Sequence, residues 1–161
     1  VHTAARKALV DALARRGIPA TVYTPPVGER LNLPIAALDG PDDGPTVAVI
    51  VRGEATAAGK TARAVKAATA YRNLTVYLVI DAAATAEALN RHAAGRTEDY
   101  LLFLEAGIEP ADPRWLSRLM AYAHLPGVGA TGGLVVRANG DIVSAGTVLG
   151  MSDGYLPGDA F

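Results

Sequence analysis

A glycine, a lysine and a threonine follow an early apolar run in an order that phosphate-binding loops use. The stretch TVAVIVRGEATAAGKT places Gly53 ahead of Gly59, Lys60 and Thr61. A P-loop needs a glycine, four residues and then Gly-Lys-Ser/Thr, because its backbone N–H groups must converge on one phosphate. Here five residues separate the two glycines, and Glu54 puts a carboxylate where the phosphate should lie. A P-loop-like nucleotide binder is therefore the weakest of the functional hypotheses.

Charged residues also stand at the ends of three apolar runs. Arg52 and Gly53 end the first run, Asp81 ends the second and Glu105 ends the third. In open α/β sheets, ligands bind at the carboxyl ends of the parallel strands. Charged residues are also common there as solvated strand ends or helix caps. These four residues therefore mark where a site would lie without defining its chemistry.

Apolar runs alternate with helical patterns through the middle of the chain. The runs Val47–Val51, Val76–Ile80 and Leu101–Leu104 are continuous, which is typical of strands in a parallel sheet covered on both faces. We expect a three-layer, Rossmann-like α/β sheet, mostly parallel, in which these runs are adjacent central strands. A fourth strand is expected within residues 128–136, followed by a C-terminal hairpin that turns at Asn139-Gly140.

Capping residues mark two of the expected helices. Thr85 precedes the helical pattern AEALNRHAAG and is expected as its N-cap. Asp112 is expected to cap the helix that contains WLSRLMAYAHL, with Pro113 at its first position.

The first 45 residues are expected to form an appendage and a linker. Ala4–Arg16 has an amphipathic helical pattern that stops at Gly17, and a short strand follows in IPATVYT. Proline, glycine and acidic residues then cluster in Asp39–Pro45. We therefore predict a boundary that separates residues 1–45 from a main domain at residues 46–161.

Composition excludes several classes of function. The net charge of −1 excludes a strongly basic surface for nucleic acid. The absence of cysteine excludes disulfides, thiol catalysis and thiolate metal sites, and it suits a reducing cytosol. No apolar run reaches the roughly 18 residues that a membrane span needs. We expect no nucleic-acid partner, no membrane span in this chain, and a cytoplasmic location, or one at the membrane surface through segments outside this sequence.

The second half of the chain carries a more specific combination of motifs. The strand DYLLFLEAG is followed by Trp115-Leu116, by PGVGATGG, by Asn139-Gly140 and by Ala145-Gly146. Upstream, VAVIV and NLTVYLVID complete the pattern. Together these segments, over roughly Thr46 to Gly150, resemble the nucleotide-sugar-binding region of family 2 glycosyltransferases, which have the GT-A fold.

The resemblance implies a nucleotide-sugar-dependent transferase with a UDP- or dTDP-sugar as its donor. It places Asp81, Arg52, Gly53 and Glu105 in the nucleotide-sugar site. It also implies a divalent cation, magnesium or manganese, held by an Asp-x-Asp motif at the end of the third strand.

The chain departs from the family pattern at that motif. The Asp-x-Asp site reads Glu105-Ala106-Gly107, so the second carboxylate is missing and Glu105 is a poor metal site alone. The segment from Asp81 to Tyr100 is also too short for the strand that the family usually has there. The family's acceptor half, which supplies the general base, would follow Phe161, and no catalytic residue is identified in the chain.

These departures leave two leading hypotheses of different kinds. The first is a glycosyltransferase-like domain with weak or no activity as this isolated chain. The second is a non-catalytic structural or interaction module of a larger glycosyltransferase or complex. Both imply a protein partner or further domains of the same polypeptide.

Overall fold

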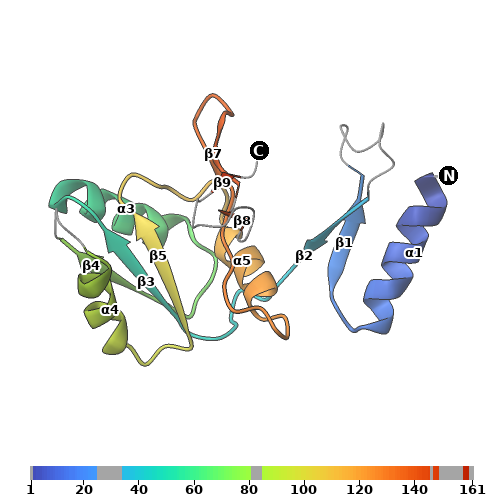
Figure 1. The fold of residues 1–161 in the computed structure, drawn as a ribbon, viewed down its shortest axis with the longest axis horizontal. Helices are drawn as coiled ribbons and strands as arrows, with labels where there is room; N and C mark the ends of the chain where they lie inside the picture. Colours follow the sequence, from blue (N-terminus) through green and yellow to red (C-terminus); the bar gives the residue numbers. More distant parts are fainter. Residues whose placement is uncertain (1, 25–33, 81–84, 146, 149–157, 160–161) are drawn as a thin grey trace.

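The computed structural model describes residues 2–24, 34–80, 85–145, 147–148 and 158–159 (Figure 1). The elements in chain order are α1 (His2–Arg15), β1 (Ala20–Tyr23), β2 (Ile35–Leu38), β3 (Val47–Arg52), α3 (Ala55–Ala68), β4 (Leu74–Val79), α4 (Ala86–Ala94), β5 (Tyr100–Glu105), α5 (Trp115–Ala123), β6 (Val135–Val136), β7 (Ile142–Ser144), β8 (Thr147–Val148) and β9 (Gly158–Asp159). None of the helices in these ranges is long and apolar enough to cross a membrane.

Three parallel strands form the central sheet, in the order β4-β3-β5. The register aligns Val47 with Leu74 on one side and with Tyr100 on the other. The five residues Val47–Val51 are all buried, because β3 has a neighbouring strand at each edge and helices over its faces. The α/β fold and the three adjacent parallel strands expected from the sequence are confirmed.

The helices lie on both faces of this sheet. Val47, Val49 and Val51 point to one face and share a buried cluster with α3 and α5, which contribute Val65 and Leu116. Alternation along the strands places Tyr77 on the opposite face, where Arg96, just past the end of α4, lies 3.9 Å from the ring centroid. The arrangement is therefore three-layered, with α3 and α5 on one face of the sheet and α4 on the other.

The expected helix caps are partly confirmed. The Thr85 hydroxyl accepts a hydrogen bond from the Ala88 N–H, so Thr85 is the N-cap of α4. The expectation for α5 was wrong by two residues, since the helix begins at Trp115 and not at Pro113. The Asp112 carboxylate instead accepts from the Arg114 N–H and pairs with Arg118. It therefore holds the turn that leads into the helix.

The C-terminal hairpin forms at the expected turn. The Arg137 carbonyl accepts a hydrogen bond from the N–H of Gly140. The φ of Gly140 is 91°, a positive value that glycine adopts without strain. The expected strand within residues 128–136 is much shorter than the pattern suggested. Only Val135 and Val136 are extended, as β6, and they pair with β7 and not with the parallel sheet. Apolar runs with paired glycines, such as residues 128–134, lack the side chains that would hold a longer strand.

A small N-terminal unit lies beside α5. Its strands β1 and β2 form an antiparallel pair, and Figure 1 shows α5 between this pair and the central sheet. The Tyr122 hydroxyl of α5 donates to the Ala36 carbonyl and accepts from the Leu38 N–H. The helix therefore makes two hydrogen bonds to the backbone of β2. A two-stranded pair is marginal by itself in water, so this contact supplies part of its stability.

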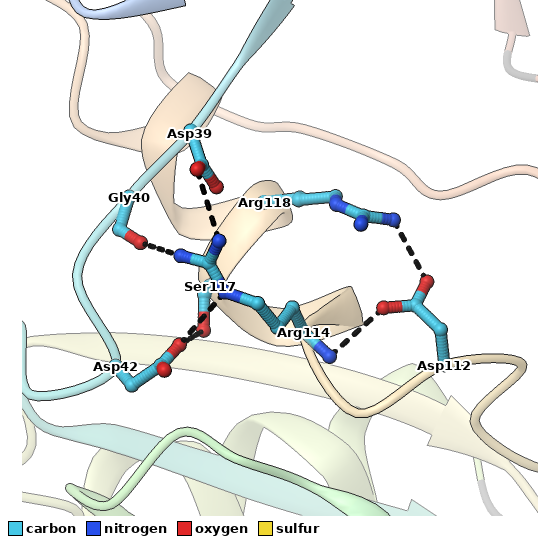
Figure 2. A network of polar contacts seen from close by, with 7 residues as sticks. All are labelled: Asp39, Gly40, Asp42, Asp112, Arg114, Ser117 and Arg118. Carbon is cyan, nitrogen blue, oxygen red and sulfur yellow. Dashed lines mark hydrogen bonds and ion pairs between the residues drawn. The ribbon is translucent and has the colours of Figure 1, made fainter.

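One arginine ties the segment after β2 to the start of α5 (Figure 2). The Arg114 guanidinium donates to the Gly40 carbonyl and pairs with the carboxylates of Asp39 and Asp42. The buried Ser117 hydroxyl donates a second hydrogen bond to Asp42. The acidic segment expected as a linker is thus bound to the main fold. The predicted division at residue 45 stays a prediction.

Truncation of a buried leucine should cost far more stability than truncation of an exposed one. Leu116 is fully buried in the cluster under β3, whereas Leu101 on β5 is 43% exposed. We expect Leu116→Ala to lower the free energy of unfolding by about 2–5 kcal/mol and Leu101→Ala by less than about 1 kcal/mol. Urea denaturation followed by circular dichroism measures both. Equal losses would show that α5 does not pack on the sheet as described.

The Asp42 contacts predict a pH dependence of stability. The Ser117 hydrogen bond, followed by the Arg114 guanidinium, lowers the pKa of Asp42 in the folded protein. This contribution is present above the unfolded pKa of about 3.9 and is lost as the pH falls through the lower folded pKa. Asp42→Asn and Ser117→Ala should each flatten the loss of stability on acidification, measured by thermal unfolding from pH 6 to pH 2. An unchanged acid profile in both variants would contradict the contact.

Candidate functional site

The candidate site lies at the carboxyl edge of the sheet, between β3 and β5. From β3 the chain continues to β4 on one side, and β5 then returns to the other side. In such sheets the crevice forms where the strand order reverses. Because both strands run parallel in register, their last residues, Arg52 and Glu105, lie directly opposite each other.

Arg52 and Glu105 form an ion pair at this point. The Nε and terminal nitrogen of Arg52 both contact Oε1 of Glu105, and the side chains are 38% and 52% exposed. The residue that the sequence suggested as a metal ligand is therefore held by a guanidinium. The structure brings together Arg52, Gly53 and Glu105, as expected for residues at the ends of neighbouring parallel strands. Two of them, Arg52 and Glu105, bind each other.

Gly53 is explained by close packing between two loops. Its φ is 145°, and a Cβ placed on it would lie 2.5 Å from the Cβ of Ala106. Any side chain at this position would push the turn after β3 away from the turn after β5. The glycine thus allows the approach that sets Arg52 beside Glu105.

Gly107 occupies the position where the family motif has its second acid. Its φ is 97°, a conformation that L side chains rarely adopt. Its N–H donates to the hydroxyl of Thr61, which is buried on α3, over a distance of 2.8 Å. The turn after β5 is thus built on a glycine, and an aspartate there would need a different backbone.

The α3 N-terminus is occupied by the protein's own carboxylate. Glu54 accepts from the N–H groups of Thr56 and Ala57, at 3.0 and 3.1 Å, and these two bonds lower the pKa of its carboxyl group. The helix begins at Ala55, so Gly59 lies inside it and not in the loop before it. The backbone N–H groups that a P-loop would offer to a phosphate are already bonded, which argues against the P-loop hypothesis.

The two remaining residues of the Gly-Lys-Thr sequence have structural contacts. Lys60 pairs with Glu109 at 3.1 Å on the surface, and Thr61 is the acceptor for Gly107. At the carboxyl edge of the sheet, Arg52 is thus paired with Glu105, Lys60 is paired with Glu109, and the Glu54 carboxylate is bound to backbone N–H groups.

Asp81, the fourth residue expected at the site, lies outside the described residues. Its distance to Arg52 or Glu105 therefore stays untested, and its role in binding a nucleotide remains a prediction.

The residues that the structure describes at this edge do not fit a divalent cation. Magnesium and manganese need several hard oxygen ligands whose charge offsets their own. Glu105 supplies one carboxylate, already paired with Arg52, and the next acid along the chain, Glu109, pairs with Lys60. Across the described ranges, no group of three or more histidine, cysteine, aspartate or glutamate residues is placed to hold a metal ion.

Sequence reasoning missed a cavity at the opposite edge of the sheet. It has a volume of about 370 Å³ and lies between the N-terminal unit and α5. Its walls combine Tyr71 with residues near positions 16–19, 38–45 and 120–126. No local motif signals such a cavity, because it exists only where four segments that are distant in the sequence meet.

The close approach of the two loops can be tested with a pair of substitutions. Gly53→Ala should lower the free energy of unfolding by about 1–3 kcal/mol, through the clash with Ala106 and the strained φ. Ala106→Gly in the same chain should recover the part of the loss that is due to the clash. Urea denaturation of the four members of this double-mutant cycle gives the coupling. A Gly53→Ala variant as stable as the wild type would contradict the described turn.

Among known proteins, one partial similarity bears on the chain. No family model matches it, and no solved structure matches it. Part of the chain is similar to the O-antigen biosynthesis protein RfbC of Myxococcus xanthus, with 39% identity over 66 residues. The aligned stretch is 40% of this chain and 5% of that protein, so the chain spans only a small part of its relative. The similarity relates part of the chain to a protein named for O-antigen biosynthesis.

Proposed function

We propose that this chain is a glycosyltransferase-like domain of a sugar-polymer system, and that its donor site is neutralised by its own side chains. The observation that carries the proposal is the Arg52–Glu105 ion pair at the point where the strand order reverses. That pair stands where the related enzymes are expected to hold a cation and a nucleotide diphosphate. The domain accordingly has weak or no transferase activity by itself.

The charge balance at the edge supports this proposal. A nucleotide diphosphate needs positive charge, from a metal ion or from arginine and lysine side chains, to stabilise its oxygens. Arg52 and Lys60 are two cations at this edge, and each is paired with a glutamate. A diphosphate must therefore displace Glu105 or Glu109, and it gains little net charge complementarity by doing so.

The related alternative is a non-catalytic module within a larger protein or complex. The partial similarity favours this alternative, because the relative is many times longer than the aligned stretch. In that case the sheet is a structural or interaction unit, and catalysis belongs to further domains or to a protein partner. The P-loop alternative has lost its support, since Glu54 caps α3.

Metal and nucleotide binding test the proposal. We expect no calorimetric signal for manganese at sub-millimolar concentrations, and UDP binding weaker than about 1 mM, or about −4 kcal/mol. Glu105→Gln should tighten the binding of UDP and UDP-sugars, because it removes a carboxylate that competes with the diphosphate for Arg52. Ligand-observed NMR with UDP, UDP-sugars, dTDP-sugars and ATP measures these affinities.

Matched variants separate the hypotheses. Glu109→Gln tests Lys60 in the same way. Asp43→Asn, which removes the carboxylate that pairs with Arg72 at the amino edge of the sheet, is the control for a general gain of positive charge. A gain in Glu105→Gln that Asp81→Ala removes would support a neutralised donor site. No gain with any nucleotide would leave the non-catalytic module. Sub-millimolar manganese binding that is lost in Glu105→Gln, or sugar transfer by the wild-type chain, would show that the site is not neutralised.

A further inference from the structure

The cavity between the N-terminal unit and α5 has the size and setting of a small-molecule site. Its volume of about 370 Å³ falls in the range of ligand pockets, which tend to lie where two structural units meet. The cavity is at the amino edge of the sheet, since Gly44 and Pro45, just before β3, line it. It is therefore separate from the Arg52–Glu105 pair at the carboxyl edge.

The walls of the cavity are mostly apolar. The N-terminal unit contributes Ile18 and Leu38, and the region of α5 contributes Met120, Ala121 and Leu125. Leu38 and Met120 are only 7% and 6% exposed, so they belong to a packed wall and not to a loose surface. An apolar group that entered would exchange water for these side chains, which is the favourable step in most ligand binding.

The polar groups on the walls already have partners within the protein. The Tyr71 hydroxyl donates to the Pro45 carbonyl at 2.6 Å, and the Asp39 carboxylate pairs with Arg114. His124 shares a hydrogen bond between its Nδ1 and the Tyr100 hydroxyl. A ligand body therefore does not need to supply hydrogen bonds to these groups, which again favours an apolar body.

Arg16 is the exception among the charged residues of the lining. It is exposed just beyond the end of α1, and within the described part of the chain its side chain makes no ion pair or hydrogen bond. Asp39, the acid among the lining residues, pairs with Arg114, which also pairs with Asp42 outside the lining. Arg16 is thus the charged lining residue that could face a ligand directly, and its guanidinium complements one anionic group.

We propose that this cavity binds a small amphiphilic anion, with its apolar body against Leu38, Met120 and Ala121 and its anionic group beside Arg16. Such a ligand contacts both the N-terminal unit and α5, so its binding also stabilises their contact. The proposal does not depend on the state of the donor site, because the two sites share no residues.

The probe for the test is 1-anilinonaphthalene-8-sulfonate, which has an apolar body and one sulfonate. N-phenyl-1-naphthylamine has nearly the same body without the charge and is the matched neutral probe. We expect the sulfonate to bind the wild-type chain with a fluorescence increase at one site. Arg16→Gln should weaken the sulfonate about three- to tenfold and leave the neutral probe unchanged. Arg15→Gln, one residue away and outside the lining, should change neither.

A cavity-filling variant locates the bound probe. Ala121→Phe should weaken both probes at least about tenfold, because its ring occupies the same volume. If this variant does not fold, the methyl signal of Met120 in the wild-type chain replaces it. The chain has two methionines, so Met120→Leu assigns that signal. Addition of either probe should then shift the Met120 methyl resonance.

Two outcomes would overturn the proposal. Retained binding in a folded Ala121→Phe, or an unshifted Met120 signal, would place the probe on another surface, such as the exposed Leu101 and Phe103 of β5. Equal effects of Arg16→Gln and Arg15→Gln on the sulfonate would show that Arg16 does not recognise the anion.

Discussion

The burial of β3 between two parallel neighbours is the constraint on which the rest of the structure depends. All of its residues from Val47 to Val51 are excluded from water, so their register with β4 and β5 is fixed by packing on both faces. That register brings the last residue of β3, Arg52, opposite the last residue of β5, Glu105. It also brings the following turns so close that Gly53 has no room for a side chain against Ala106. The paired charge at the carboxyl edge is thus a direct consequence of the core.

Much of the sheet could be predicted from the sequence, because its strands are continuous apolar runs. Local signals also identified Thr85 as a cap and Gly140 as a turn residue, since both act on neighbours within a few positions. The start of α3 could not be predicted from the Gly-Lys-Thr sequence, because the Glu54 carboxylate begins the helix before Gly59. The shortness of β6 was equally hidden, because pairing with a sheet depends on tertiary contacts.

The site shows the same division between local and distant causes. The sequence placed Arg52, Gly53 and Glu105 at strand ends, and the structure places them together. The sequence could not show that Arg52 and Glu105 pair with each other. The two residues are far apart in the chain and meet only through the parallel register of β3 with β5. The cavity beside α5 was still less accessible to sequence reasoning. Its apolar walls come from α5, from the end of β2 and from loops that are far apart in the sequence.

At the carboxyl edge of the sheet, the number of charged groups matters more than the strength of the Arg52–Glu105 ion pair. Arg52 and Glu105 are both partly exposed, and a surface pair of this kind contributes only about 0–1 kcal/mol. A ligand can therefore break the pair at little cost. Once it is broken, however, Glu105 remains a single carboxylate and Gly107 supplies no second one, so the described residues still offer a divalent cation too few ligands. Arg52 likewise remains one cation facing a diphosphate of higher charge. For the proposed donor site, the backbone at Gly107, set by its contact with Thr61, is thus a stronger obstacle to a metal-bound diphosphate than the Arg52–Glu105 salt bridge.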